Sequence, residues 1–148
     1  MKKYNIAVVG ASGNVGREIL NILNFRSFPI KEMYALASSK SEGQKIIYGN
    51  DKEIVIKSLE KFDFKGVDIV FSSAGSEVSK KFIPRAVKSG AIIIDNTSCF
   101  RMHKDVPLIV PEVNLEDLKN FKKKKIIANP NCSTIQMVMA LKPIHDLF

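Results

Sequence analysis

The chain has 148 residues, of which 45% are hydrophobic and 26% are charged, a balance typical of one folded domain with its own core. No apolar run approaches the roughly 18 to 20 residues that a membrane span needs. The apolar part of the N-terminus, Ile6–Val9, is also too short for a secretory signal. These features predict a cytoplasmic protein with no membrane segment.

The formal net charge of +8 raises the question of a nucleic-acid partner. The lysines are scattered, apart from Lys122–Lys125, and neither zinc-finger spacing nor an RNA-binding aromatic pair is present. The lysine run is interpreted as a solvated helix end or turn. The two cysteines, Cys99 and Cys132, are expected to be free thiols in a reducing compartment. We therefore expect a small phosphorylated partner, no nucleic acid and no metal.

Short apolar runs alternate with amphipathic stretches along the whole chain. In chain order, the pattern predicts a strand at 4–10, a helix at 14–25, strands at 32–38, 44–49, 53–58 and 67–75, a helix at 76–90, a strand at 91–98, a helix at 114–121, a strand at 125–130 and a helix at 133–148. Pro84 is expected to kink or split its helix, and Asn114 is expected to cap the next one. Interleaved strands and helices predict an α/β protein with a Rossmann-like, doubly wound, mostly parallel sheet.

A glycine-rich turn joins the first predicted strand to the first predicted helix. The sequence GASGNVG places Gly10, Gly13 and Gly16 at a spacing that is a variant of the dinucleotide-binding fingerprint. Gly10 permits the tight turn, Gly13 lets the backbone approach a pyrophosphate, and Gly16 lets the helix pack close to the strand. The alternative is a tight turn that binds no ligand.

Two further loops favour NADP as the cofactor. The second strand ends in Ser38, Ser39, Lys40 and Ser41 instead of the acid that usually binds the ribose of NAD, and hydroxyls with an ammonium group suit a 2′-phosphate. Ser73, Ala74 and Gly75 follow a later buried strand, so their backbone is expected to line the cofactor. The alternatives are a polar surface loop and an ordinary strand–helix connection.

Cys132 is the candidate nucleophile. It follows Pro130 and Asn131 and precedes Ser133 and Thr134, either of which can cap the last helix. At a helix N-terminus, the dipole favours a thiolate, and free N–H groups can bind an oxyanion. A reactive thiol beside a dinucleotide site indicates aldehyde dehydrogenation, or the reverse reduction of an activated acid. The alternative is a buried structural cysteine.

Arg101, with Asn96 close to it in sequence, follows another strand end and can bind a phosphate or carboxylate in bidentate fashion. The spacing fits a surface arginine that binds no ligand equally well. Cys99 is interpreted as a packing residue. His103 and His145 are interpreted as surface residues, not as catalytic bases.

The motifs GASGNVG, ASSKSEG, DNTSCFRM, VPEVN and NPNCSTIQM occur in an order that resembles the aspartate-semialdehyde dehydrogenases. The resemblance implies NADP-dependent interconversion of L-aspartyl 4-phosphate with L-aspartate 4-semialdehyde and phosphate, a step in lysine, diaminopimelate, methionine and threonine biosynthesis. It also implies particular site residues. These are Cys132 as nucleophile, Arg101, Asn96 and Asn131 at the substrate phosphate, Ser12, Gly13, Asn14 and Val15 at the pyrophosphate, and Lys40 and Ser41 at the 2′-phosphate.

Members of this family are about twice as long, and their second domain supplies a histidine acid/base and most of the dimer interface. The resemblance therefore implies an NADP-binding domain at 1–131 and the first helix of a truncated catalytic and dimerisation domain at 132–148. Such a chain is expected to be inactive alone, and its parent to be a homodimer or homotetramer. The alternatives are a relative of N-acetyl-glutamyl-phosphate reductase and a non-catalytic NADP-binding module.

Overall fold

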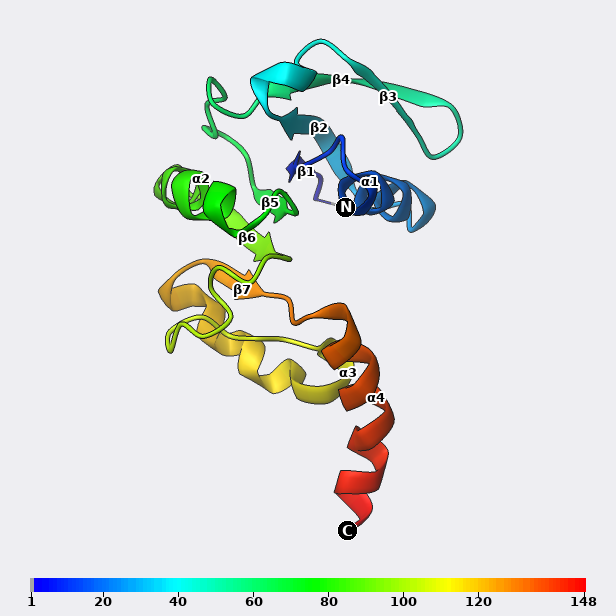
Figure 1. The fold of residues 1–148 in the computed structure, drawn as a ribbon, viewed down its shortest axis with the longest axis vertical. Coiled ribbons are helices and arrows are strands. Elements are labelled where there is room, and N and C mark those ends of the chain that lie inside the picture. The colour runs from blue at the N-terminus through cyan, green and yellow to red at the C-terminus, as the bar shows by residue number, and fades with distance from the viewer. Residues whose placement is uncertain (1) are drawn as a thin grey trace.

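The computed structural model describes residues 2–148, in which seven strands form one sheet (Figure 1). The strands are β1 (Tyr4–Val9), β2 (Ile30–Ala37), β3 (Lys45–Tyr48), β4 (Lys52–Ser58), β5 (Ile69–Ser72), β6 (Ile92–Asp95) and β7 (Ile126–Ala128). The order across the sheet is β3-β4-β2-β1-β5-β6-β7, and every pair except β3–β4 is parallel. The predicted Rossmann-like fold is confirmed.

Helices cover both faces of the sheet, with α1 and α2 on opposite sides (Figure 1). The helices are α1 (Asn14–Phe25), α2 (Ser76–Lys88), α3 (Pro111–Asn114) and α4 (Cys132–Leu147), and two 3₁₀ segments are η1 (Ser39–Ser41) and η2 (Leu115–Lys123). Strand side chains alternate between the faces. Ile6 and Val8 therefore pack in one core cluster with Leu20 of α1, whereas Ala7 and Val9 pack in another with Phe82 of α2.

Three predictions of local structure differ from the structure. Of the predicted kink or split at Pro84, the split does not occur, because α2 runs unbroken from Ser76 to Lys88. The predicted α-helix at 114–121 is the 3₁₀ segment η2, whose apolar residues recur every third position (115, 118 and 121), which is the 3₁₀ period. Asn114 does not cap η2, because its side chain accepts a hydrogen bond from Val110 N at 2.9 Å, in the preceding turn.

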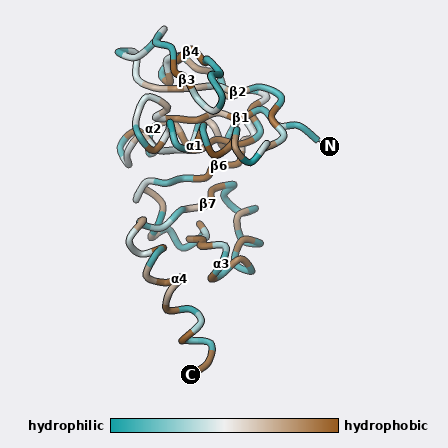
Figure 2. The backbone as a smooth tube through the Cα atoms, turned by 90° about the vertical axis from the view of Figure 1, so that its right-hand side faces the viewer, coloured by the Kyte–Doolittle hydropathy of each residue, from teal (hydrophilic) through white to brown (hydrophobic). Residues whose placement is uncertain are grey.

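The last helix, α4, extends away from the sheet and has no buried residue (Figure 1). Hydrophobic residues nevertheless recur along it (Figure 2). The exposed ones are Met137, Met139, Leu141, Ile144 and Leu147. Within residues 2–148, no helix is both long and apolar enough to cross a bilayer.

Gly16 is required by close packing of α1 on the turn after β1. A Cβ at this position would overlap the carbonyl oxygen of Gly10 and would lie 2.7 Å from the Ala11 Cα. Neither backbone atom can move without breaking the turn, because Gly10 N and Ala11 N both donate to Leu36 O. We therefore expect Gly16→Ala to lower the free energy of unfolding by about 3 kcal/mol, although alanine normally stabilises a helix.

Gly13→Ala is the matched control, because its Cβ would lie 3.4 Å from Gly10 O and its φ of −81° suits any residue. We expect this variant to lose less than about 1 kcal/mol. Urea denaturation followed by circular dichroism measures both values. Equal losses in the two variants would contradict the packing role of Gly16.

Candidate functional site

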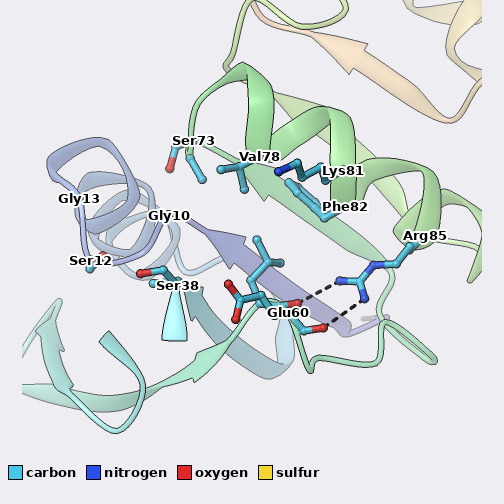
Figure 3. Close-up of a pocket in the computed structure, with 13 residues that line it drawn as sticks. Gly10, Ser12, Gly13, Ser38, Glu60, Ser73, Val78, Lys81, Phe82 and Arg85 are labelled. Carbon is cyan, nitrogen blue, oxygen red and sulfur yellow. Dashed lines mark hydrogen bonds between the residues drawn. The ribbon is translucent and has the colours of Figure 1, made fainter. Parts of the chain in front are cut away.

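A cavity of about 620 Å³ opens at the carboxyl ends of the central strands, between the loops that follow β1, β2, β4 and β5 (Figure 3). These loops meet because parallel strands place their carboxyl ends at one edge of the sheet. The cavity is lined by Gly10, Ser12, Gly13, Ala37, Ser38, Leu59, Glu60, Ser73, Ala74, Val78, Lys81, Phe82 and Arg85. Its size is within the range of sites for small molecules and cofactors.

The glycine loop forms one wall of this cavity. Gly10 has a φ of +84°, and a Cβ on it would lie only 2.8 Å from the Ser73 Oγ, so glycine is required there. Gly13 caps α1 without any side chain, and the first intrahelical bond runs from Arg17 N to Gly13 O at 3.0 Å. The N–H groups of the preceding helical residues, Asn14 to Gly16, therefore lack intrahelical acceptors and suit a bound phosphate.

The structure brings some of the predicted cofactor residues to the cavity and leaves others beside it. Gly10, Ser12, Gly13, Ser38, Ser73 and Ala74 line it. Val15, with Asn14 and Gly16, lies in the first turn of α1 and is 48% exposed. Lys40 and Ser41 lie in η1, directly after Ser38, and Lys40 is exposed. Gly75 caps α2 with a φ of +88°.

Sequence reasoning missed the contribution of α2 to the cavity. Val78, Lys81 and Arg85 all reach it, together with Phe82 (Figure 3). Their spacing of three and four residues places them on one face of the helix, but it does not show that this face meets the cavity. Arg85 donates from Nη2 to Leu59 O at 3.0 Å and from Nη1 to Glu60 O at 3.3 Å, so it holds the loop after β4 against α2.

The cavity fits a dinucleotide cofactor in four respects. A glycine-lined wall allows the backbone to approach phosphate, a helix N-terminus offers free N–H groups, and the Lys81 side chain adds positive charge on the opposite wall. Leu59 and Val78 offer an apolar surface to a base.

A second group of polar residues lies where β6 and β7 end. Arg101 donates from Nε to Asn129 O at 3.0 Å and from Nη2 to Asn96 O at 3.2 Å. The two asparagines are joined directly, with Asn129 Nδ2 donating to Asn96 Oδ1 at 2.6 Å. The structure therefore brings Arg101 and Asn96 together, and Asn129, which the sequence did not single out, completes the cluster.

Cys132 is the first residue of α4 and is exposed. The cap differs from the prediction, because Asn131 and not Ser133 or Thr134 caps the helix: Asn131 Oδ1 accepts from Ser133 N at 2.9 Å. β1, β5, β6 and β7 are parallel to one another. Cys132, after β7, therefore lies at the same edge of the sheet as Gly10, after β1. Three interstrand spacings, about 14 Å, separate the tips of β1 and β7.

A buried carboxyl group lies between the two groups of loops. Asp95 ends β6 with no exposed surface, and burial raises the pKa of its carboxyl even though Thr97, Ser72 and Ser79 oppose this by hydrogen bonding. Cys99 is half-buried, and burial, followed by the negative charge of Asp95, raises the pKa of its thiol. Cys99 therefore remains a protonated packing residue, whereas Cys132 meets solvent. Both histidines are exposed.

The raised pKa of Asp95 predicts a specific pH dependence of stability. The folded state favours the protonated acid, so Asp95 stabilises the fold below its ordinary value of 3.8, and this contribution is lost as the pH rises through the raised folded-state pKa. Asp95→Asn removes that titration.

The stability of the wild type relative to Asp95→Asn should therefore fall as the pH rises from about 3.8. Denaturant unfolding of both proteins between acid and neutral pH measures this difference. Asp63→Asn, an exposed carboxyl variant, controls for the general effect of removing one negative charge. A difference that stays constant or grows with pH would contradict the buried, destabilised carboxylate.

Comparisons with known proteins agree with this architecture. Residues 5–121 match the family described as semialdehyde dehydrogenase, NAD binding domain. Aspartate-semialdehyde dehydrogenase of Rickettsia bellii is 56% identical over 145 residues, which is 98% of this chain and 43% of that protein. The chain thus spans less than half the length of this curated relative.

Solved structures show the same fold. The crystal structure of Vibrio cholerae aspartate semialdehyde dehydrogenase II complexed with ASA matches with a TM-score of 0.93 and 48% identity, over 98% of this chain and 47% of that chain. The Candida albicans enzyme with NADP matches with a TM-score of 0.83 and 28% identity, over 99% of this chain and 48% of that one. The glycine loop, the parallel sheet and the family match together show that this chain belongs to the semialdehyde dehydrogenase NAD-binding domain family.

Proposed function

We propose that this chain is the cofactor-binding and nucleophile-bearing part of an NADP-dependent aspartate-semialdehyde dehydrogenase. The observation that carries the proposal is the position of Cys132. The thiol lies at a helix N-terminus, at the same sheet edge as the glycine-lined cavity and three residues after Asn129 of the Arg101 cluster. The names of the relatives support the choice of substrate, L-aspartyl 4-phosphate in the biosynthetic direction.

Cys132 would act as the nucleophile. Its thiolate attacks the acyl carbon of the substrate, the bond from that carbon to the phosphate oxygen breaks, and inorganic phosphate leaves behind a Cys132 thioester. Free N–H groups in the first turn of α4 would hold the oxygen that becomes negative during the attack.

Arg101 would bind the departing phosphate, with Asn96 and Asn131 beside it. Two of its five N–H groups donate to the carbonyls of Asn96 and Asn129, which fixes the plane of the guanidinium. The remaining N–H groups stay available for an anion, and a planar donor fork of this kind suits phosphate.

The cavity would hold NADP, which when bound supplies the hydride that reduces the thioester to the aldehyde and releases the Cys132 thiol. Ser12, Gly13, Asn14 and Val15 would bind the pyrophosphate, flanked by Gly10 and Gly16, with Ser73, Ala74 and Gly75 on the other side. Ser38, Lys40 and Ser41 would bind the 2′-phosphate. The NADP complex of the Candida albicans relative supports this choice.

The chain would divide into an NADP-binding domain at 1–131 and a helix at 132–148 that belongs to a catalytic and dimerisation domain. The exposed apolar residues of α4 support this division, because an isolated helix of this kind buries nothing of its own. The histidine acid/base would come from that further domain. We therefore propose that residues 1–148 alone bind NADP weakly and turn over little, and that the whole enzyme is a cytoplasmic homodimer or homotetramer.

A chimera tests the proposed reaction. Residues 1–148 are joined to the part of the Rickettsia bellii relative that lies beyond the matched region, and phosphate-dependent reduction of NADP is measured with aspartate semialdehyde. We expect activity in the chimera, little in the 148-residue chain, and a loss of at least about a thousandfold in the Cys132→Ser chimera.

Two outcomes would contradict this reaction. Activity with N-acetyl-glutamate semialdehyde in place of aspartate semialdehyde would indicate the N-acetyl-glutamyl-phosphate reductase alternative. The other outcome is a chimera that binds NADP tightly but shows no activity, and in which Cys99→Ser and Cys132→Ser have the same effect. This would indicate a non-catalytic NADP-binding module.

Lys40 tests the choice of NADP over NAD. Because its ammonium group would pair with the 2′-phosphate, we expect Lys40→Ala to weaken NADP binding about tenfold and to leave NAD binding unchanged. Lys31→Ala is the matched control, since Lys31 is an exposed lysine near the opposite end of β2. Isothermal titration calorimetry with both cofactors measures the effect, and equal weakening by the two substitutions would refute a specific contact.

A further inference from the structure

We propose that Asp95, which has no role in the reaction outlined above, is a positioning residue that holds Arg101 and Asn129 together beside the Cys132 loop. This rests on the proposed function only for the role of Arg101 in binding phosphate. The contacts of Asp95 with the turn do not depend on that role.

The first observation is that one buried carboxylate organises the whole turn after β6. Asp95 Oδ1 accepts from Thr97 N at 3.1 Å, and Asp95 Oδ2 accepts from Thr97 Oγ1 at 3.0 Å. This is an Asx turn, in which a side chain substitutes for a backbone turn. Thr97 Oγ1 in turn accepts from Cys99 N at 3.2 Å, which extends the turn toward Arg101.

The second observation is that this turn carries the acceptors of Arg101. Asn96, inside the turn, offers its carbonyl to Arg101 Nη2 and its Oδ1 to Asn129 Nδ2. The backbone of Asp95 also accepts from Asn129 N at 2.8 Å, so the ends of β6 and β7 are joined at the same place. If the turn loosens, Arg101 loses one acceptor directly and the other through Asn129.

The third observation is that the carboxyl group also contacts the cofactor side. Ser79 Oγ of α2 donates to Asp95 Oδ1 at 3.4 Å, and Ser79 Oγ lies 2.7 Å from Ser72 Oγ, at the end of β5. Ser72 directly precedes Ser73 and Ala74, which line the cavity. Asp95 thus lies at the junction between the cavity loop and the Arg101 cluster.

An asparagine reproduces only part of the hydrogen bonding of this carboxyl. The carboxylate accepts from one N–H and two hydroxyls. The Oδ1 of an asparagine could still accept from Thr97 N and Ser79 Oγ, but its N–H₂ group would remove the acceptor of the Thr97 hydroxyl and would compete for Thr97 Oγ1 with Cys99 N. Losing this buried hydrogen bond is expected to loosen the turn locally.

The test uses the 148-residue chain labelled with ¹⁵N, and measures hydrogen exchange of the Arg101 Nε–H group, which donates to Asn129 O. We expect exchange to be roughly tenfold or more faster in Asp95→Asn and in Thr97→Val. Thr97→Ser keeps the hydroxyl and should restore the wild-type rate. Backbone amides of β1 report global opening, and their exchange should change much less than that of Arg101 Nε–H.

Two results would overturn the proposal. One is an unchanged Arg101 rate in a folded Asp95→Asn or Thr97→Val variant. The other is an equal acceleration at Arg101 and in β1, which would mean general destabilisation. Titration with inorganic phosphate is a separate arm: a wild-type Arg101 Nε–H signal that does not respond to phosphate would count against the proposed function, while the exchange rates alone decide the role of Asp95.

Discussion

The parallel alignment of the central strands is the constraint on which the rest of this structure depends. β1, β5, β6 and β7 all run in the same direction, so the loops that follow them emerge at one edge of the sheet. The glycine turn, the Ser73–Gly75 loop, the Asp95 turn and the Cys132 helix are consequently neighbours in the order of the strands. Reversal of β7 alone would move Cys132 to the opposite edge of the sheet, away from the cavity.

Two groups of polar atoms lie at that edge of the sheet, and they differ in burial. Around the cavity, backbone N–H groups and exposed side chains remain available to a ligand. Around Asp95, hydroxyls, N–H groups and the carboxylate satisfy one another in the interior. A buried charge is tolerated only when donors surround it, and such a network orders the loops on either side. The Arg101 cluster lies between these extremes, with part of its guanidinium bound internally and part free.

The helix that carries the thiol differs from the other parts of the site. Its first turn is held by the Asn131 cap, but its length is exposed and largely apolar on several sides. A thiol at the capped start of a helix whose apolar residues are exposed is consistent with the proposal that groups outside this chain complete the site. The likeness to relatives more than twice as long agrees with that interpretation.

The sequence by itself determined the sheet class, the glycine turn and the position of Cys132 at a helix start, because each depends on local periodicity, glycine spacing and proline placement. The family resemblance was equally visible in short motifs. Only the tertiary structure decided that Lys81 and Arg85 of α2 face the cavity, that Asn129 joins Asn96 and Arg101, and that Asp95 is buried between them. These contacts join residues distant in sequence, and local pattern does not encode which loops meet. The cap at Asn131 was missed because Asn, Ser and Thr are all favoured at helix caps. The 3₁₀ form of 115–123 was missed although its apolar residues recur every third position.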